Sequence, residues 1–147
     1  MALRNIIKEG NELLYKKCKP VEVFDNKLST LIDDMIETMD NARGVGLAAP
    51  QVGILRRVVV IRIGDEKPIE LVNPEIVAIS GEQREEEGCL SCPGASGITL
   101  RPMCVTVKGK NRKGEEISYT GKGLKARAFC HEIDHLDGIL FKSRLVK

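Results

Sequence analysis

The sequence has few aromatic residues and no long apolar run. Its 147 residues include two tyrosines, three phenylalanines and no tryptophan, so little is available to stack on nucleic-acid bases. No stretch of 18 apolar residues is present to cross a bilayer. Basic and acidic residues number 23 and 21, and this balance gives no electrostatic reason to bind nucleic acid or a membrane surface. We therefore expect neither as a partner.

The sequence also lacks the cysteine pattern of a small secreted protein. Its cysteines are odd in number, and the N-terminal residues do not have the long apolar centre of a signal peptide. We therefore expect free or metal-bound thiols in a reducing cytoplasm. The length suits a single domain over residues 1–147, large enough to bury a core without disulfides. The five cysteines are Cys18, Cys89, Cys92, Cys104 and Cys130.

Apolar periodicity predicts two helices. The first begins near Asp25, where Asp25 or Asn26 can cap it, and it ends before Gly44. The second runs from about Gly123 to Asp137 and has apolar side chains on two nearly opposite faces. A helix buried on two sides lies between layers of structure rather than on the surface.

Short strand-like runs fill much of the remaining chain. They cover residues 57–63, 69–79 and 98–107, and a hairpin is expected around residues 111–114. Strands before and beside a doubly buried helix indicate an α+β fold, with antiparallel strands packed around a central helix.

The second predicted helix carries the sequence His131-Glu132-Ile133-Asp134-His135, which has the form HExxH. Residues i and i+4 of a helix lie about 40° apart around its axis, so both imidazoles can reach one metal ion. Glu132 can then act as general base toward a water molecule at the metal. These are the only two histidines in the chain.

Two imidazoles are too few for a tight metal site. The twelve residues after His135 contain neither histidine nor glutamate, so the third ligand must come from upstream. Cys89 is the natural candidate, and Cys92 is the alternative three residues later. One thiolate and two imidazoles leave a fourth position open, as in catalytic sites.

A third segment, Gly44-Val45-Gly46-Leu47-Ala48-Ala49-Pro50-Gln51, combines two glycines with an apolar body. It lacks the Lys-Ser/Thr of a phosphate-binding loop. Its one polar group is the side-chain amide of Gln51, and hydrolases commonly direct such an amide at a developing oxyanion.

Together the three segments resemble the peptide deformylase family. The matching motifs are GVGLAAPQ at residues 44–51, EGCLS at 87–91 and HEIDHLDG at 131–138. Their order, their spacing and the chain length all fit, and the similarity covers nearly the whole chain. The sequence departs from the family's usual residues at Tyr15, Ser96 and Cys130.

The resemblance implies a metal-dependent amide hydrolase that removes the formyl group from the N-terminal formylmethionine of newly made polypeptides and releases formate. Ferrous iron is the usual native metal of the family, and zinc, nickel or cobalt can replace it. Some members contact the ribosome through a C-terminal helical extension, which is not seen here, so we expect at most a transient contact.

The resemblance also implies a role for each matching residue. The implied metal ligands are Cys89, His131 and His135. Glu132 would be the general acid and base, and Gln51 and the backbone N–H of Leu90 would stabilise the oxyanion. Gly46 would pair through its backbone with the substrate, and the methionine pocket would be lined by Val45, Leu124 and Ala128.

Two other functions are compatible with HExxH. An HExxH endopeptidase is disfavoured because no third ligand follows His135. A metal-binding or redox-sensing module could use Cys89 and the two histidines, but it leaves Glu132 and Gln51 without a purpose.

Overall fold

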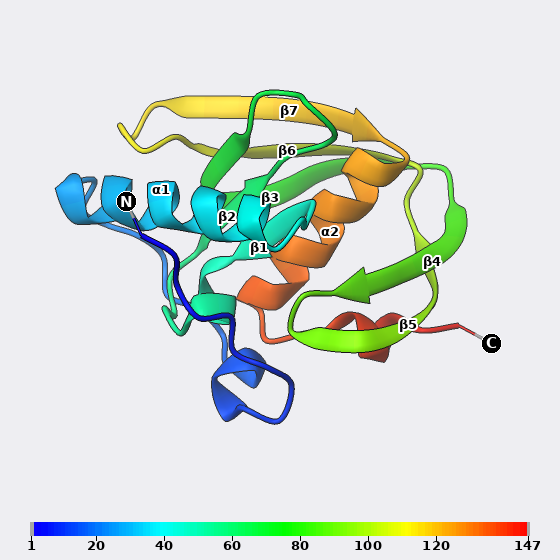
Figure 1. Ribbon diagram of the computed structural model, residues 1–147. Coiled ribbons are helices and arrows are strands. Elements are labelled where there is room, and N and C mark those ends of the chain that lie inside the picture. Colours follow the sequence, from blue (N-terminus) through cyan, green and yellow to red (C-terminus); the bar gives the residue numbers. More distant parts are fainter. Residues whose placement is uncertain (1, 147) are drawn as a thin grey trace.

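The computed structural model describes residues 2–146 and has an α+β architecture built around one central helix. This helix, α2 (Leu124–Leu136), runs between a five-stranded sheet and a separate two-stranded sheet (Figure 1). Both sheets are antiparallel. The expected fold class, with antiparallel strands around the HExxH helix, is therefore confirmed. Within residues 2–146, no helix is long and apolar enough to cross a membrane.

The larger sheet has the strand order β1-β2-β3-β6-β7, and the smaller sheet pairs β4 with β5. The larger sheet consists of β1 (Gly46–Ala48), β2 (Val58–Ile61), β3 (Ile69–Ser80), β6 (Cys104–Lys110) and β7 (Glu116–Lys122). The smaller sheet consists of β4 (Gln83–Cys89) and β5 (Cys92–Arg101). Three short 3₁₀ helices, η1 (Glu12–Tyr15), η2 (Ala49–Val52) and η3 (Phe141–Arg144), lie in the connections.

The helix α1 (Asn26–Asn41) covers the face of the larger sheet opposite α2. It begins where the sequence indicated, because the Asp25 carboxylate accepts a hydrogen bond from the Leu28 N–H at 3.1 Å. Alternate residues of a strand point to opposite faces. In β2, Val58 and Val60 accordingly pack against the α1 side, while Val59 and Ile61 pack against α2. Because both faces of β2 are buried, all of its residues are apolar.

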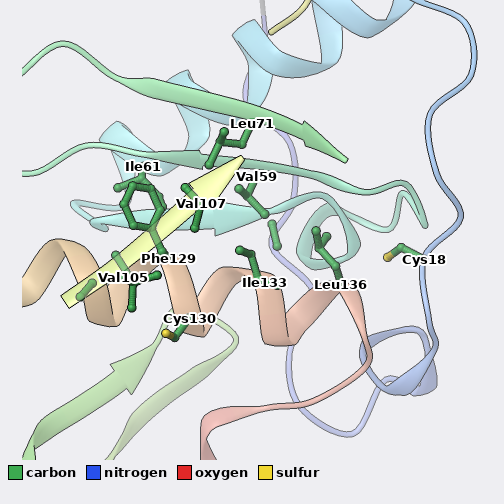
Figure 2. Packing of buried hydrophobic residues seen from close by; sticks show 13 residues of the cluster. Cys18, Val59, Ile61, Leu71, Val105, Val107, Phe129, Cys130, Ile133 and Leu136 are labelled. Atoms are coloured by element: carbon green, nitrogen blue, oxygen red, sulfur yellow. The ribbon is translucent and has the colours of Figure 1, made fainter. Parts of the chain in front are cut away.

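The main core lies between α2 and the larger sheet. Phe129, Ile133 and Leu136 of α2 project toward Val59 and Val107 of the sheet (Figure 2). Burying this face fixes the rotation of α2 about its axis. His131 and His135 then lie on the side of α2 that faces away from the sheet. This agrees with the prediction, made from the two apolar faces of the helix, that α2 is buried on both sides.

The structure corrects the prediction of one strand over residues 98–107. The chain breaks there at Pro102, so β5 ends at Arg101 and β6 begins at Cys104 in the other sheet. Proline has no N–H to donate to a strand ladder. The predicted run 69–79 is confirmed as β3, the run 57–63 contains the shorter strand β2, and the hairpin at 111–114 joins β6 to β7.

No sequence pattern indicated β4. Its residues, QREEEGC, are polar because most of the strand is solvent-exposed, and only Gln83 and Glu87 are buried. Periodic apolar residues are the main sequence signal for a strand, and β4 has none. This strand nevertheless carries Cys89 to the candidate site.

Candidate metal centre and active site

Three side chains from two elements meet beside α2. Cys89 at the end of β4 and the two histidines of α2 place one sulfur and two ring nitrogens within 4.8 Å of one another. The Cys89 Sγ lies 3.3 Å from the His135 Nε2. One thiolate and two imidazoles suit zinc, ferrous iron, nickel or cobalt, so the residues present fit a metal ion of this kind.

Cys92, the alternative third ligand, is not part of this group. Its sulfur donates a hydrogen bond to the Glu9 carboxylate at 3.3 Å. Burial and the neighbouring Glu9 raise the pKa of Cys92 to about 12. Metals bind the thiolate rather than the thiol, so Cys92 is poorly suited to be a ligand.

Glu132 is buried next to the three donors, with its Oε2 4.0 Å from the His131 Nε2. Burial disfavours the charged carboxylate and raises the pKa of Glu132 to about 7, although the nearby His131 opposes this shift. Its other oxygen, Oε1, is buried without a hydrogen-bond partner in the described part of the chain. A buried and unpaired carboxylate oxygen is available to a water molecule or a substrate.

Gln51 belongs to η2 and is buried close to Cys89. Its Oε1 accepts the Ala48 N–H at 2.9 Å, and its Nε2 donates to the Ser91 hydroxyl at 3.1 Å. The same Nε2 lies 3.6 Å from the Cys89 Sγ. The amide is therefore fixed in orientation, with its N–H groups on the side of the candidate metal centre.

A cavity of about 350 Å³ opens above these groups. Its lining includes all but one of the site residues predicted from the sequence. These are Val45, Gly46, Gln51, Cys89, Leu90, Leu124, Ala128, His131 and Glu132. The exception, His135, is fully buried beneath the cavity beside Cys89. Val45 and Leu124 are 40% and 51% exposed, which leaves apolar surface free at the mouth of the cavity.

A buried ionic network that no sequence motif indicated lies behind His131. Glu87 Oε2 lies 3.2 Å from the His131 Nδ1 and accepts a 2.7 Å hydrogen bond from Arg101. Arg101 also pairs with Asp134 of α2 at 2.8 Å, and Arg127 donates to Thr99 at 3.1 Å. The only sequence signal was the position of Glu87 two residues before Cys89. No sequence signal pointed to Arg101, because the residues that it pairs with are distant from it in the chain.

The network fixes the charge on Glu87 and the orientation of His131. Burial alone would raise the pKa of Glu87, but the hydrogen bonds from His131 and Arg101 outweigh burial and hold this pKa at about 2. Glu87 is therefore ionised at neutral pH. The Glu132 carboxylate, the Cys89 sulfur and the Glu87 carboxylate together outweigh the burial of His131 and raise the pKa of this imidazole. A carboxylate on the far nitrogen of a metal-ligating histidine typically orients the ring and increases its basicity.

We expect Glu87→Gln to destabilise the fold by about 3 kcal/mol, because it leaves the buried Arg101 without its main counter-charge. Urea unfolding in excess chelator measures this without a contribution from metal binding. Glu86→Gln, one residue earlier and exposed, is the matched control and should shift stability by no more than about 0.5 kcal/mol. Equal effects of the two substitutions would contradict the importance of the buried network.

The fold and the site define an α+β hydrolase class in which an HExxH helix and a cysteine form a candidate metal centre next to a buried glutamate. The family model described as polypeptide deformylase matches residues 3–147. The chain belongs to the polypeptide deformylase family, whose members are metal-dependent enzymes that remove the N-formyl group from nascent polypeptides. The expected family and enzymatic activity are thus confirmed.

Individual relatives are similar over the whole chain. A peptide deformylase of Acetivibrio thermocellus is 56% identical over 147 residues, which cover 100% of this chain and 86% of the relative. The crystal structure of a peptide deformylase from Legionella pneumophila superposes with a TM-score of 0.95 at 50% identity, covering 98% of this chain and 86% of that one. The crystal structure of a peptide deformylase from Thermotoga maritima superposes with a TM-score of 0.95 at 42% identity, and the match covers 99% of each chain.

Proposed function

We propose that this chain removes the formyl group from the N-terminal formylmethionine of new polypeptides through a metal held by Cys89, His131 and His135. The observation that carries the proposal is the meeting of these three donors beneath a cavity that Glu132 and Gln51 also line. The products are formate and a free methionine amine.

Ferrous iron is the proposed native metal, with zinc, nickel or cobalt as substitutes. Soft thiolate and borderline imidazole donors bind all of these ions. When bound, such an ion acts as a Lewis acid and lowers the pKa of a coordinated water toward about 7. Metal analysis of anaerobically purified protein tests the choice of iron, and zinc as the main metal under those conditions would contradict it.

Glu132 is the proposed general base and acid. Its carboxylate takes the proton of the water that attacks the formyl carbon, and later protonates the leaving methionine amine. Burial raises the pKa of Glu132 above the usual value of a glutamate, and this favours a carboxyl group that can donate a proton as well as accept one. The unpaired Oε1 leaves one oxygen free for this exchange.

Gln51 and the backbone N–H of Leu90 are the proposed oxyanion donors. The Gln51 amide is already oriented by Ala48 and Ser91, so little reorganisation is needed as negative charge develops on the carbonyl oxygen. Leu90 follows Cys89 directly and lines the same cavity.

The substrate chain is proposed to pair with the backbone of Gly46, with its methionine side chain against Val45, Leu124 and Ala128. These residues line the cavity mouth next to Glu132. A formyl carbon carries only hydrogen beyond the amide, so a tight site can accept it and reject the larger acetyl group.

The absence of a side chain at Gly46 also leaves room for the Glu132 carboxylate. A Cβ at position 46 would lie 2.5 Å from the Glu132 Oε2 and 2.9 Å from its Cγ and Cδ. We expect Gly46→Ala to push the carboxylate aside and to lower kcat by about 10²-fold, since small misplacements of reacting groups are costly. Steady-state kinetics at full metal content measure this. An unchanged kcat would mean that the position of Glu132 is not critical.

The ligand assignment is tested by replacing each of two neighbouring cysteines. We expect Cys89→Ser to lose most of the bound metal, because a hydroxyl is a much poorer ligand for this kind of ion. Cys92→Ser should keep the metal and can still donate a hydrogen bond to Glu9. Metal content after gel filtration gives the comparison, and equal loss in both variants would refute Cys89 as the ligand.

The activity is tested with formyl-Met-Ala-Ser, acetyl-Met-Ala-Ser and casein. We expect the metal-loaded protein to release formate from the first peptide and to leave the other two substrates intact. Cleavage of casein without release of formate would instead indicate an endopeptidase.

We also propose that residues 1–147 act as one catalytic domain in the cytoplasm, on nascent chains and in transient contact with the ribosome. The bacterial sources of the relatives support this setting. Sedimentation with translating ribosomes at low and high salt tests the contact. Failure to sediment with them at low salt would count against it.

A further inference from the structure

A second cysteine lies across a short turn from Cys89. β4 ends at Cys89 and β5 begins at Cys92, with only Leu90 and Ser91 between them in the turn. The two cysteines form the last pair of the antiparallel ladder, where the register shifts between Gly88 and Cys89. They also flank a two-residue turn, and the first and fourth residues of a β-turn have Cα atoms less than about 7 Å apart. Disulfides form between Cα atoms about 4.4–6.8 Å apart.

The surroundings of the two sulfurs agree with this pairing. Cys92 belongs to a small buried cluster with Leu14, Leu140 and Phe141, and Cys89 packs against the same cluster. Cys18 and Cys130 lie instead in the core between α2 and the larger sheet. Of the cysteines in these clusters, Cys92 is the one that shares a cluster with Cys89.

The two thiols differ in access and in charge environment. Cys89 is partly exposed and lines the cavity, so a small oxidant can reach it. Cys92 is 3% exposed and donates its proton toward the Glu9 carboxylate at 3.3 Å. Cys89 is thus the sulfur that meets an oxidant first, and Cys92 is placed to react second, with Glu9 available to take its proton.

We propose that Cys89 and Cys92 form a reversible disulfide when the protein meets a peroxide, which withdraws the Cys89 sulfur from the metal centre and protects it from irreversible oxidation. This inference rests on the proposed role of Cys89 as a metal ligand. What the inference adds is a modification site, in which Cys89 is paired with Cys92, a residue outside the metal centre.

The proposed chemistry has two balanced steps. In the first, the Cys89 thiolate attacks hydrogen peroxide, the O–O bond breaks, and a sulfenic acid and hydroxide form. In the second, the Cys92 sulfur attacks the Cys89 sulfur. The S–O bond breaks, hydroxide leaves, and the Cys92 proton passes through Glu9 to form water. Overall, one thiolate and one thiol are oxidised to a disulfide, and one peroxide is reduced to one hydroxide ion and one water molecule.

The test treats the metal-loaded protein with a small excess of hydrogen peroxide. Free thiols are then alkylated in denaturant, and the tryptic peptide 85–108 is sequenced by tandem mass spectrometry. This peptide contains Cys89, Cys92 and Cys104, because trypsin does not cleave between Arg101 and Pro102. We expect loss of two thiols per chain, a Cys89–Cys92 link with Cys104 still alkylated, and release of metal in parallel. Dithiothreitol and fresh metal should reverse all three changes.

Cys92→Ser removes the partner and keeps the hydrogen bond to Glu9. In this variant we expect Cys89 to proceed to sulfinic acid, which dithiothreitol does not reduce. Cys104→Ser is the matched control and should form the Cys89–Cys92 link as the unaltered protein does. The proposal is overturned if the unaltered protein carries sulfinic acid at Cys89 with Cys92 free. It is equally overturned if Cys92→Ser recovers as completely as the unaltered protein.

The readouts separate this inference from the proposed function. The disulfide is detected by mass, and the metal by its release, without any assay of deformylation. Deformylase activity of the reduced, metal-loaded protein is measured before oxidation. An inactive protein that still forms the link would contradict the proposed function alone, whereas an active protein that forms no link would contradict this inference alone.

Discussion

Glu132→Gln is expected to bind metal normally and to lose about 10²–10⁴-fold in kcat. The amide has nearly the shape of the carboxylate, so it fits the buried position beside Gly46. It cannot accept a proton from the attacking water or return one to the leaving amine. Metal content and formate release measured on the same preparation give the result.

The control for Glu132 is Glu86→Gln. Glu86 also lines the cavity, but it is exposed and forms its hydrogen bond with Ser96 at 2.7 Å. Its replacement should leave kcat within about twofold, as expected for a surface side chain away from the reacting atoms. A Glu132→Gln protein with near-normal turnover at full metal content would sink the proposed proton transfer.

Gln51→Ala is expected to lower kcat by about 10²–10³-fold, equivalent to about 3–4 kcal/mol of transition-state stabilisation. The KM should rise much less, because the amide meets the carbonyl oxygen mainly as negative charge develops there. The substitution also removes the acceptor of the Ala48 N–H, so some loss of thermal stability should accompany the kinetic effect. Kinetics are therefore measured well below the melting temperature.

Ser91→Ala separates the two contributions of Gln51. Ser91 is fully buried and holds the Gln51 Nε2 at 3.1 Å, so its removal loosens the amide without deleting it. We expect a smaller loss of kcat than in Gln51→Ala. If Gln51→Ala lowers stability while kcat stays unchanged, the amide is a structural element that holds η2, and the oxyanion role is wrong.

Local patterns were sufficient to predict the central helix and its chemistry. The i, i+4 spacing of His131 and His135 places both imidazoles on one side of any α-helix, whatever surrounds it. The apolar residues on the opposite side, such as Phe129 and Ile133, indicated that this helix is buried between layers. Both features depend on helix geometry alone, which is why the structure agrees with them.

Sequence patterns failed where pairing between distant strands determines the outcome. The run 98–107 has apolar residues throughout, yet it divides at Pro102 between two sheets. Conversely, β4 has no apolar periodicity and is a strand because it pairs with β5. A strand on a largely exposed two-stranded sheet is stabilised by its ladder and needs few buried side chains.

The sequence by itself therefore identified the two histidines, Glu132 and Cys89 as candidate site residues, with Cys92 as the alternative third ligand. The tertiary structure supplied a geometric reason to prefer Cys89, because the hairpin between β4 and β5 places the Cys89 sulfur near the histidines and the Cys92 sulfur near Glu9. It alone revealed Arg101 as the counter-charge of Glu87, 14 positions away. The physical reason is range: helix spacing is set by neighbouring residues, whereas strand register and buried ion pairs exist only after distant segments have packed together.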